Sequence, residues 1–146
     1  MTLSDIARDH KRMAALVQDG IVEIEAELDS LGGIKGKAVT AGYKAVTKVK
    51  PEFVPENIRR LVPMCAPALD RHVAEATQAG VPIADHFSLY SDSVAEDLLG
   101  ATDERARVAN NPLAVGVYEK LRPSAKDRVT AAMPRLAKLV ERHHDA

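Results

Sequence analysis

Apolar residues near the N-terminus recur at intervals of three and four positions. This spacing places them on one face of an α-helix, and it continues from residue 3 to residue 31. Ser4 is a favourable N-cap, and Gly32 and Gly33 are typical of a helix C-terminus. Gly20 lies on the apolar stripe, where it indicates a break or the close approach of another helix. The stripe consists of Leu3, Ile6, His10, Met13, Val17, Gly20, Ile24, Leu28 and Leu31.

Helical spacing continues along the rest of the chain. The helix that follows Pro55 should end before Gly80, and Pro63 should produce a kink or a fresh start because proline removes a backbone hydrogen bond. No segment alternates convincingly with period two. We therefore predict an all-α, single-domain helical bundle of about six to eight helices over residues 1–146. The further helices are expected over 34–50, 81–90, 91–100, 102–109, 112–122 and 123–144.

Two segments of the chain resemble each other. "PMCAPALDRH" begins at Pro63 and "PRLAKLVERH" begins at Pro134, with proline, alanine, arginine and histidine at matching offsets. The pattern predicts two similar halves packed about a pseudo-twofold axis, or else a chance likeness between helices rich in alanine, leucine and arginine. If the two halves are equivalent, the paired prolines must occupy the same place on their helices.

The stretch "GGIKGKAVTAGYKAVTKVKP" combines glycines with lysines and lacks acidic residues. It does not have the glycine, lysine and hydroxyl spacing of a phosphate-binding loop. At 3.6 residues per turn, its small and aliphatic residues share one arc, and Gly42 lies at the centre of that arc. We expect this arc to pack closely against the core, with Lys37, Lys44 and Lys48 outward. The lysines should either pair with the acidic end of the first helix or form an anion-binding or partner-docking face.

Composition narrows the classes of function. The net charge is −1, and no aromatic residues are interleaved with the lysines, so nucleic acid is not an expected partner. No apolar run reaches the length of a membrane span, so no membrane association is expected. The N-terminal segment has charges where a signal peptide would be apolar, and there is one cysteine. These features indicate a cytoplasmic protein.

The residues capable of chemistry are few and scattered. Glu141-x-x-His144 has the spacing found in di-iron bundles, but the partner motifs that such a site needs are missing. We therefore predict no metal site, no cofactor and no catalytic residue. The remaining candidates are pocket residues near the proline-interrupted helix: His10, Cys65 and His72.

Three segments resemble a family of small, mostly actinobacterial proteins of unknown function. They are "GIKGKAVTAGYKAVTKVKPEFVP", "LLGATDERA" and "YEKLRPSAK". The resemblance implies a bacterial origin and a single helical domain, and it implies nothing about mechanism.

Because no catalytic constellation has the required spacing, the sequence favours a non-catalytic role in protein interaction or scaffolding, with the chain itself (as a homodimer) or another protein as partner. The alternative is a small-molecule binder with an apolar pocket beside Pro63 and Pro67. An enzyme that uses a His/Cys pocket is the third hypothesis.

Overall fold

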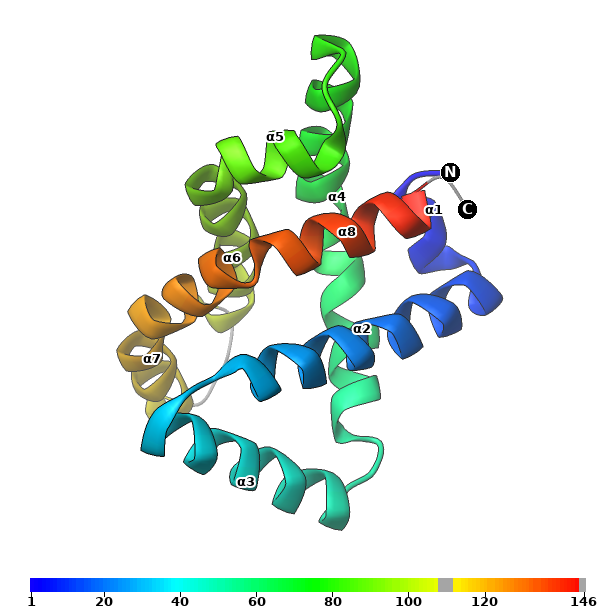
Figure 1. Ribbon diagram of the computed structural model, residues 1–146. Coiled ribbons are helices and arrows are strands. Elements are labelled where there is room, and N and C mark those ends of the chain that lie inside the picture. Colours follow the sequence, from blue (N-terminus) through cyan, green and yellow to red (C-terminus); the bar gives the residue numbers. More distant parts are fainter. Residues whose placement is uncertain (108–111, 145–146) are drawn as a thin grey trace.

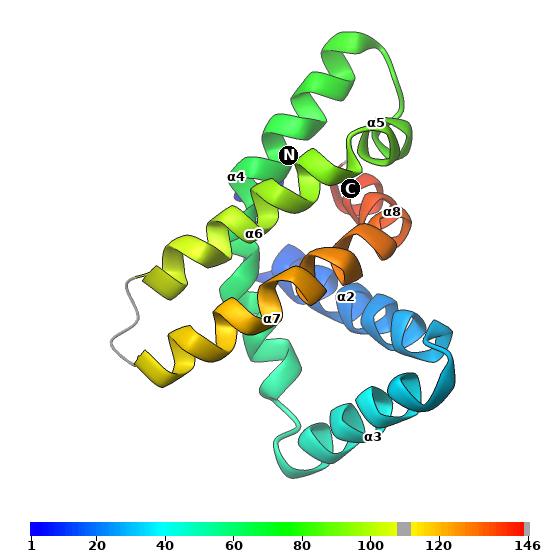
Figure 2. The ribbon, with the colours of Figure 1, turned by 90° about the vertical axis from the view of Figure 1, so that its left-hand side faces the viewer.

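The computed structural model describes residues 1–107 and 112–144, apart from several side chains within the helices on either side of the gap. The described residues form eight helices and no strand (Figures 1 and 2). The prediction of an all-α bundle of six to eight helices is therefore confirmed. The elements are α1 (Leu3–Arg8), α2 (His10–Ser30), α3 (Gly33–Val49), α4 (Phe53–Ala79), α5 (Ile83–Leu89), α6 (Ser91–Arg107), α7 (Pro112–Ala131) and α8 (Met133–His144).

The predicted long first helix is interrupted at Asp9, which separates α1 from α2, and so that prediction is wrong. Asp9 adopts an extended conformation and its side chain accepts a hydrogen bond from the backbone N–H of Arg12, which makes Asp9 the N-cap of α2. Thr2, and not Ser4, caps α1, in a reciprocal capping box with Asp5. Gly20 causes no break, since α2 continues through it.

Asp70 attaches α1 to α4. Its carboxylate accepts hydrogen bonds from the backbone N–H of Leu3 (2.7 Å), from the backbone N–H of Ser4 (3.0 Å) and from the Ser4 hydroxyl (2.7 Å). The backbone N–H groups in the first turn of a helix have no partner within the helix, and a negative charge there is favourable. Asp70 therefore fixes the start of α1 although it lies 66 residues further along the chain.

The proline-containing helix α4 runs unbroken for 27 residues. It bends about midway, as Figure 2 shows, near the exposed residues Pro63 and Pro67. The predicted kink is therefore present, and no new helix starts there. Gly80 ends α4 in the left-handed conformation, with φ of 69°, which glycine adopts without strain.

α4 touches five other helices, namely α1, α2, α3, α5 and α6. α8 lies beside α2 and contacts α5. The buried core between these elements is aliphatic apart from Phe87, in keeping with the low aromatic content of the chain. The largest fully buried side chains are Phe87, Ile6, Met133, Val17 and Val94.

The prediction for α3 is wrong in its orientation. Its predicted inner arc faces solvent: Val49 is 78% exposed, and a Cβ added to Gly42 would meet no atom within 4 Å. The face toward the bundle instead carries Gly36, Thr40 and Tyr43, a buried residue and two half-buried ones. The glycine in close contact is Gly36, because an added Cβ would lie 2.5 Å from the carbonyl oxygen of Leu31.

Two boundaries in the C-terminal half also differ from the prediction. α6 continues past Thr102, and α7 continues through Pro123 to Ala131, so no helix starts at either position. Pro134 is the second residue of α8, whereas Pro63 lies in the interior of α4. The paired prolines thus occupy different places, and the predicted equivalence of the two halves is not supported.

Candidate functional site

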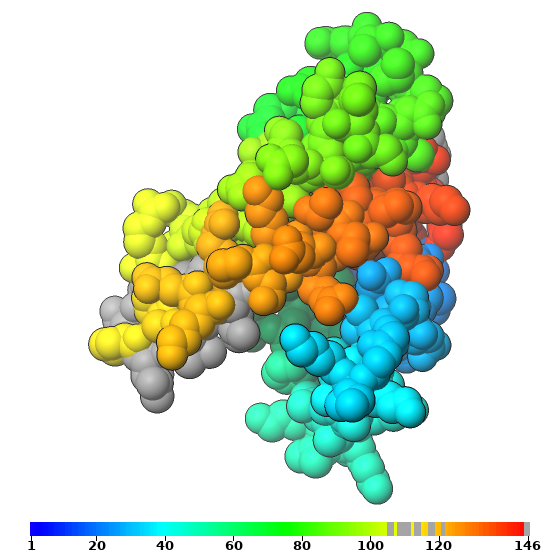
Figure 3. Space-filling view, turned by 60° about the vertical axis from the view of Figure 1, so that its left-hand side comes forward, coloured from blue at the N-terminus to red at the C-terminus, as the bar shows by residue number. Residues whose placement is uncertain are grey.

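An apolar hollow that is partly open to solvent lies between α2 and α4 on one side and α6, α7 and α8 on the other. It consists of two adjoining cavities of about 310 Å³ and about 530 Å³. Figure 3 shows the hollow between the cyan end of the α2–α3 region and the orange C-terminal helices. We call the two together the apolar cavity. Residues that line both parts include Leu16, Ile58, Val62, Val129, Leu136 and Leu139.

The bend in α4 and the small side chains of the core explain the apolar cavity. α2 contacts both α4 and α8, so it spaces these two helices apart on either side of the hollow. Aliphatic side chains such as Val62 and Val129 do not reach across this space, and the chain has no tryptophan to fill it. The hollow lies against α4, the helix for which the sequence suggested an apolar pocket, but neither Pro63 nor Pro67 lines it.

Charged side chains lie at one side of the apolar cavity. Arg135 of α8 binds Glu27 of α2, with 2.9 Å between Nε and Oε2, and it also pairs with Glu23 at 3.6 Å. Arg128 of α7 lines the same part and is exposed. Within the described part of the chain, Arg128 has no ion pair.

The three predicted pocket residues do not come together. His10 is exposed at the first position of α2, and Cys65 lines the apolar cavity. Burial raises the pKa of the Cys65 thiol, which disfavours the thiolate needed for nucleophilic chemistry. His72 lies two helical turns further along α4, where it contacts residues of α5 and α6. A shared His10–Cys65–His72 pocket is absent from the described structure.

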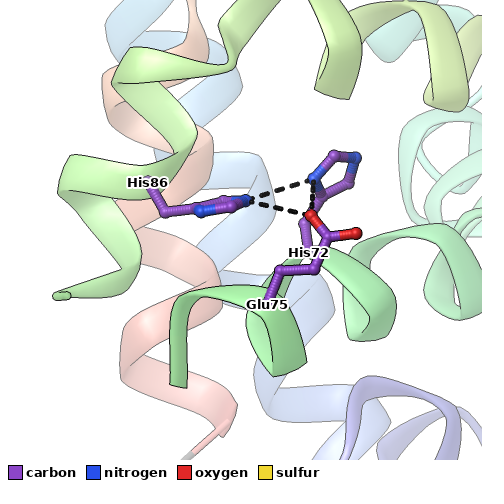
Figure 4. Close-up of side chains that lie close together, drawn as sticks. All are labelled: His72, Glu75 and His86. Atoms are coloured by element: carbon purple, nitrogen blue, oxygen red, sulfur yellow. Dashed lines mark hydrogen bonds and ion pairs between the residues drawn. The ribbon is translucent and has the colours of Figure 1, made fainter. Parts of the chain in front are cut away.

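His72 instead belongs to a polar cluster of its own, with His86 of α5 and Glu75 of α4 (Figure 4). The two histidines are 4% and 5% exposed. Nε2 of His72 lies 2.7 Å from a carboxylate oxygen of Asp97, which Arg71 also binds at 2.6 Å. A groove of about 400 Å³ adjoins the cluster and is lined by His86, Glu75, Asp85 and Tyr90 among others.

His72 was predicted as a pocket residue, but its partners in this cluster were not predicted. One signal was available, because His72 and Glu75 are three positions apart on a helix and so share a face. No sequence pattern pointed to His86 or Asp97, because only the packing of α5 and α6 against α4 brings them close. The motif singled out instead, Glu141-x-x-His144, has a structural use: Glu141 accepts a hydrogen bond from the backbone N–H of Ala84 near the start of α5.

The lysines of α3 are all exposed, including the three proposed as a docking face. No ion pair joins Lys37, Lys44 or Lys48 to any described residue. The acidic side chains of α2 pair with α8 instead, for example Asp19 with His143 at 2.6 Å. The predicted pairing of the acidic and basic helices is therefore wrong, and the docking face remains a prediction.

Comparison with known families places the chain. A family model described as "Family of unknown function (DUF6918)" matches residues 3–144. The chain belongs to this DUF6918 family. The match covers nearly the whole sequence, and so the resemblance noted from its motifs is confirmed as a family of unknown function. No curated protein and no solved structure matches the chain significantly. None of the described helices of this DUF6918 protein combines the length and apolar character needed to span a bilayer.

Proposed function

We propose that this DUF6918 protein binds one aliphatic small molecule in its apolar cavity. The observation that carries the proposal is an apolar hollow, partly open to solvent, whose two parts measure about 310 Å³ and about 530 Å³. Ligand pockets in proteins typically measure about 300–1,000 Å³ and are mostly apolar, with a few polar groups that orient the ligand. The cavity has both properties, since its walls are aliphatic and its charged residues lie to one side.

The hydrophobic effect supports an occupant. The hollow is partly open to solvent, and half-buried aliphatic side chains such as Leu136 and Leu139 line both of its parts. Covering such apolar surface is favourable. An aliphatic ligand would fill the space and bury its own apolar surface.

The charges at the side of the cavity suggest the end group of the ligand. Arg135 is already neutralised by Glu23 and Glu27. Arg128 lines the same part of the cavity and has no ion pair among the described residues. A guanidinium in this position would bind a carboxylate or a similar anion. We therefore propose an aliphatic acid, with its chain inside the bundle and its anionic end beside Arg128.

Two measurements test this proposal. Native mass spectrometry of protein purified without organic solvent should show added mass that is lost on denaturation. Titration with cis-parinaric acid, a fluorescent fatty acid, should show saturable binding that Val62→Phe weakens by narrowing the cavity. Val22 is 63% exposed on α2, so Val22→Phe is the matched control and should bind normally. If the probe binds Val62→Phe as tightly as it binds the wild type, the cavity is not the site.

The end-group assignment has its own control. Arg128→Glu should weaken the binding of the acid but not that of the corresponding alcohol, since only the acid carries the charge. Arg60 is exposed on α4 and does not line the cavity, so Arg60→Glu should leave both affinities unchanged. Equal loss of affinity for the acid and the alcohol in Arg128→Glu would refute the assigned orientation.

The interaction role expected from the sequence is the second candidate, and one observation favours it. The apolar arc of α3 is exposed, with Ile34 at 88% and Val49 at 78%, and lysines flank it. A homodimer that covers this arc would appear in the same native mass spectrum at twice the mass, and Val49→Glu should dissociate it. A spectrum with monomers alone would contradict this candidate. Cytoplasmic location and bacterial origin remain predictions.

A further inference from the structure

We propose that His72, Glu75 and His86 form a binding site for one divalent transition metal ion, best suited to Zn²⁺, with a coordination position open to solvent. The site is separate from the apolar cavity and does not depend on the ligand proposed there. Its basis is the convergence of three donor atoms from two helices, which Figure 4 shows. Nδ1 of His72, Nε2 of His86 and a carboxylate oxygen of Glu75 all lie within 4.8 Å of one another.

The separations between these atoms fit a tetrahedral ion. They are 3.4 Å between the two imidazole nitrogens, 3.5 Å from His86 to Glu75 and 3.7 Å from His72 to Glu75. Zinc binds histidine nitrogen and carboxylate oxygen at about 2.0–2.2 Å, so two ligands at the tetrahedral angle stand roughly 3.3–3.6 Å apart. The three donors therefore already have nearly the spacing that the ion requires, and shifts of a few tenths of an ångström in Glu75 would complete it.

Asp97 orients the first ligand. Its carboxylate lies 2.7 Å from Nε2 of His72, so the Nε2–H donates a hydrogen bond to Asp97 and the lone pair of Nδ1 points toward His86 and Glu75. Arg71 in turn binds Asp97 at 2.6 Å and holds the carboxylate in place. A histidine that donates its second ring nitrogen to a carboxylate is the usual arrangement around protein-bound zinc.

A second histidine of the same chain shows what a structural pair looks like. His143 is buried and lies 2.6 Å from a carboxylate oxygen of Asp19, as His72 does from Asp97. Among the described residues, no further histidine or carboxylate of the kind needed for a three-ligand group joins that pair. Both His–Asp pairs therefore hold helices together. Among the described residues, two more donor atoms lie close to the other ring nitrogen at His72 but not at His143.

The donor set and the surroundings define the kind of ion. Imidazole nitrogens suit Zn²⁺ and its neighbours in the first transition series, whereas Mg²⁺ and Ca²⁺ prefer oxygen ligands. The two histidines are almost fully buried, but half of the Glu75 side chain is exposed and faces the groove of about 400 Å³. Three protein ligands beside an accessible groove leave a fourth position for water or a small anion, as in catalytic zinc sites.

Calorimetric titration of the metal-stripped full chain with ZnCl₂ tests the site. We expect saturable binding of one equivalent. Asp97→Asn should weaken it by about 10- to 100-fold, as the loss of an outer partner typically does, and Glu75→Gln or His86→Gln should weaken it further. His10→Gln is the matched control for adventitious binding to an exposed histidine, and it should bind normally. The same titration with Co²⁺ should give the intense visible absorption of four-coordinate cobalt.

The outcome is decisive even if a buried variant folds poorly. Glu75 is half-exposed, so Glu75→Gln should keep the wild-type circular dichroism spectrum and melting temperature. The proposal is overturned if the wild type binds no zinc saturably, or if folded Glu75→Gln binds zinc as tightly as the wild type. Weak six-coordinate cobalt absorption would likewise contradict the tetrahedral site.

Discussion

Two glycines on the same helix should respond to alanine in opposite directions. Gly36→Ala places a Cβ 2.5 Å from the carbonyl oxygen and 2.7 Å from the carbonyl carbon of Leu31. These are backbone atoms, which cannot move aside as a flexible side chain could. Overpacking of this kind destabilises proteins by about 1–3 kcal/mol, which exceeds the gain of up to about 1 kcal/mol in helix propensity from replacing glycine by alanine.

Gly42→Ala should increase helix propensity without introducing a steric clash. A Cβ at this position meets nothing within 4 Å, so the variant should be more stable than the wild type by about 0.4–1 kcal/mol. In thermal unfolding the melting temperature should rise by roughly 1–4 °C for Gly42→Ala and fall for Gly36→Ala. Urea unfolding of both variants supplies the free energies. If Gly42→Ala destabilises the protein, the inner and outer faces of α3 have been assigned the wrong way round.

Two further predictions concern α1 and α2. Asp70→Ala removes three hydrogen bonds to the start of α1 and should lower the free energy of unfolding by about 2–4 kcal/mol. The control Glu119→Ala, at an exposed position of α7, should change it by no more than about 0.5 kcal/mol. Equal effects of the two substitutions would contradict the role of Asp70. The hydrogen bond from His143 lowers the pKa of the Asp19 carboxyl in the folded protein. The ionised carboxylate therefore stabilises the fold fully above its unfolded pKa of about 3.9. This stabilisation is lost as the pH falls through the lower pKa of the folded state. Asp19→Asn should therefore have a lower melting temperature than the wild type at pH 7, and this difference in melting temperature should shrink below about pH 4. Melting curves recorded across this pH range test the prediction. A difference that does not depend on pH would refute the role of the Asp19 carboxylate.

Local sequence patterns predicted where helices form more reliably than they predicted where each helix ends or which side it buries. The kink near Pro63 follows from the chemistry of one residue, as does the helix end at Gly80, and both were predictable. The break at Asp9 was not, because a helical spacing of apolar residues continues across it and the cap depends on one side-chain hydrogen bond. Pro123 was predicted to start a helix but lies within α7. An interior proline costs a helix about 3 kcal/mol, which local propensity alone does not offset.

The orientation of α3 shows the limit of reasoning from amphipathicity. An apolar arc usually marks the buried face because its burial drives packing. In α3 the centre of the arc consists of alanine and glycine, which gain little on burial, and the helix instead packs the side of Gly36 against the preceding turn. The helix and its exposed lysines were therefore predictable from the sequence, but the apolar arc was assigned to the wrong side.

The candidate sites were predictable only in part. A pocket against the aliphatic residues of α4 was predictable, although neither Pro63 nor Pro67 lines the apolar cavity. The cluster around His72 was not, because its other ligand-bearing helix, α5, is placed by packing against α4 and α8 and by the contact between Glu141 and Ala84. Such long-range contacts carry no periodic signal in the sequence.

The central position of α4 has a consequence for cooperativity. Five helices rest on it, from α1 near one end of the sequence to α6 well beyond its midpoint, so α4 cannot open without releasing most of the core. Its amide protons should then exchange with solvent only when the whole domain unfolds. In the described part of the chain α3 makes its main contacts with α2 and α4, and its separation would expose little apolar surface that is now buried. We therefore expect α4 to be protected until global unfolding, and α3 to detach and return while the remainder stays native.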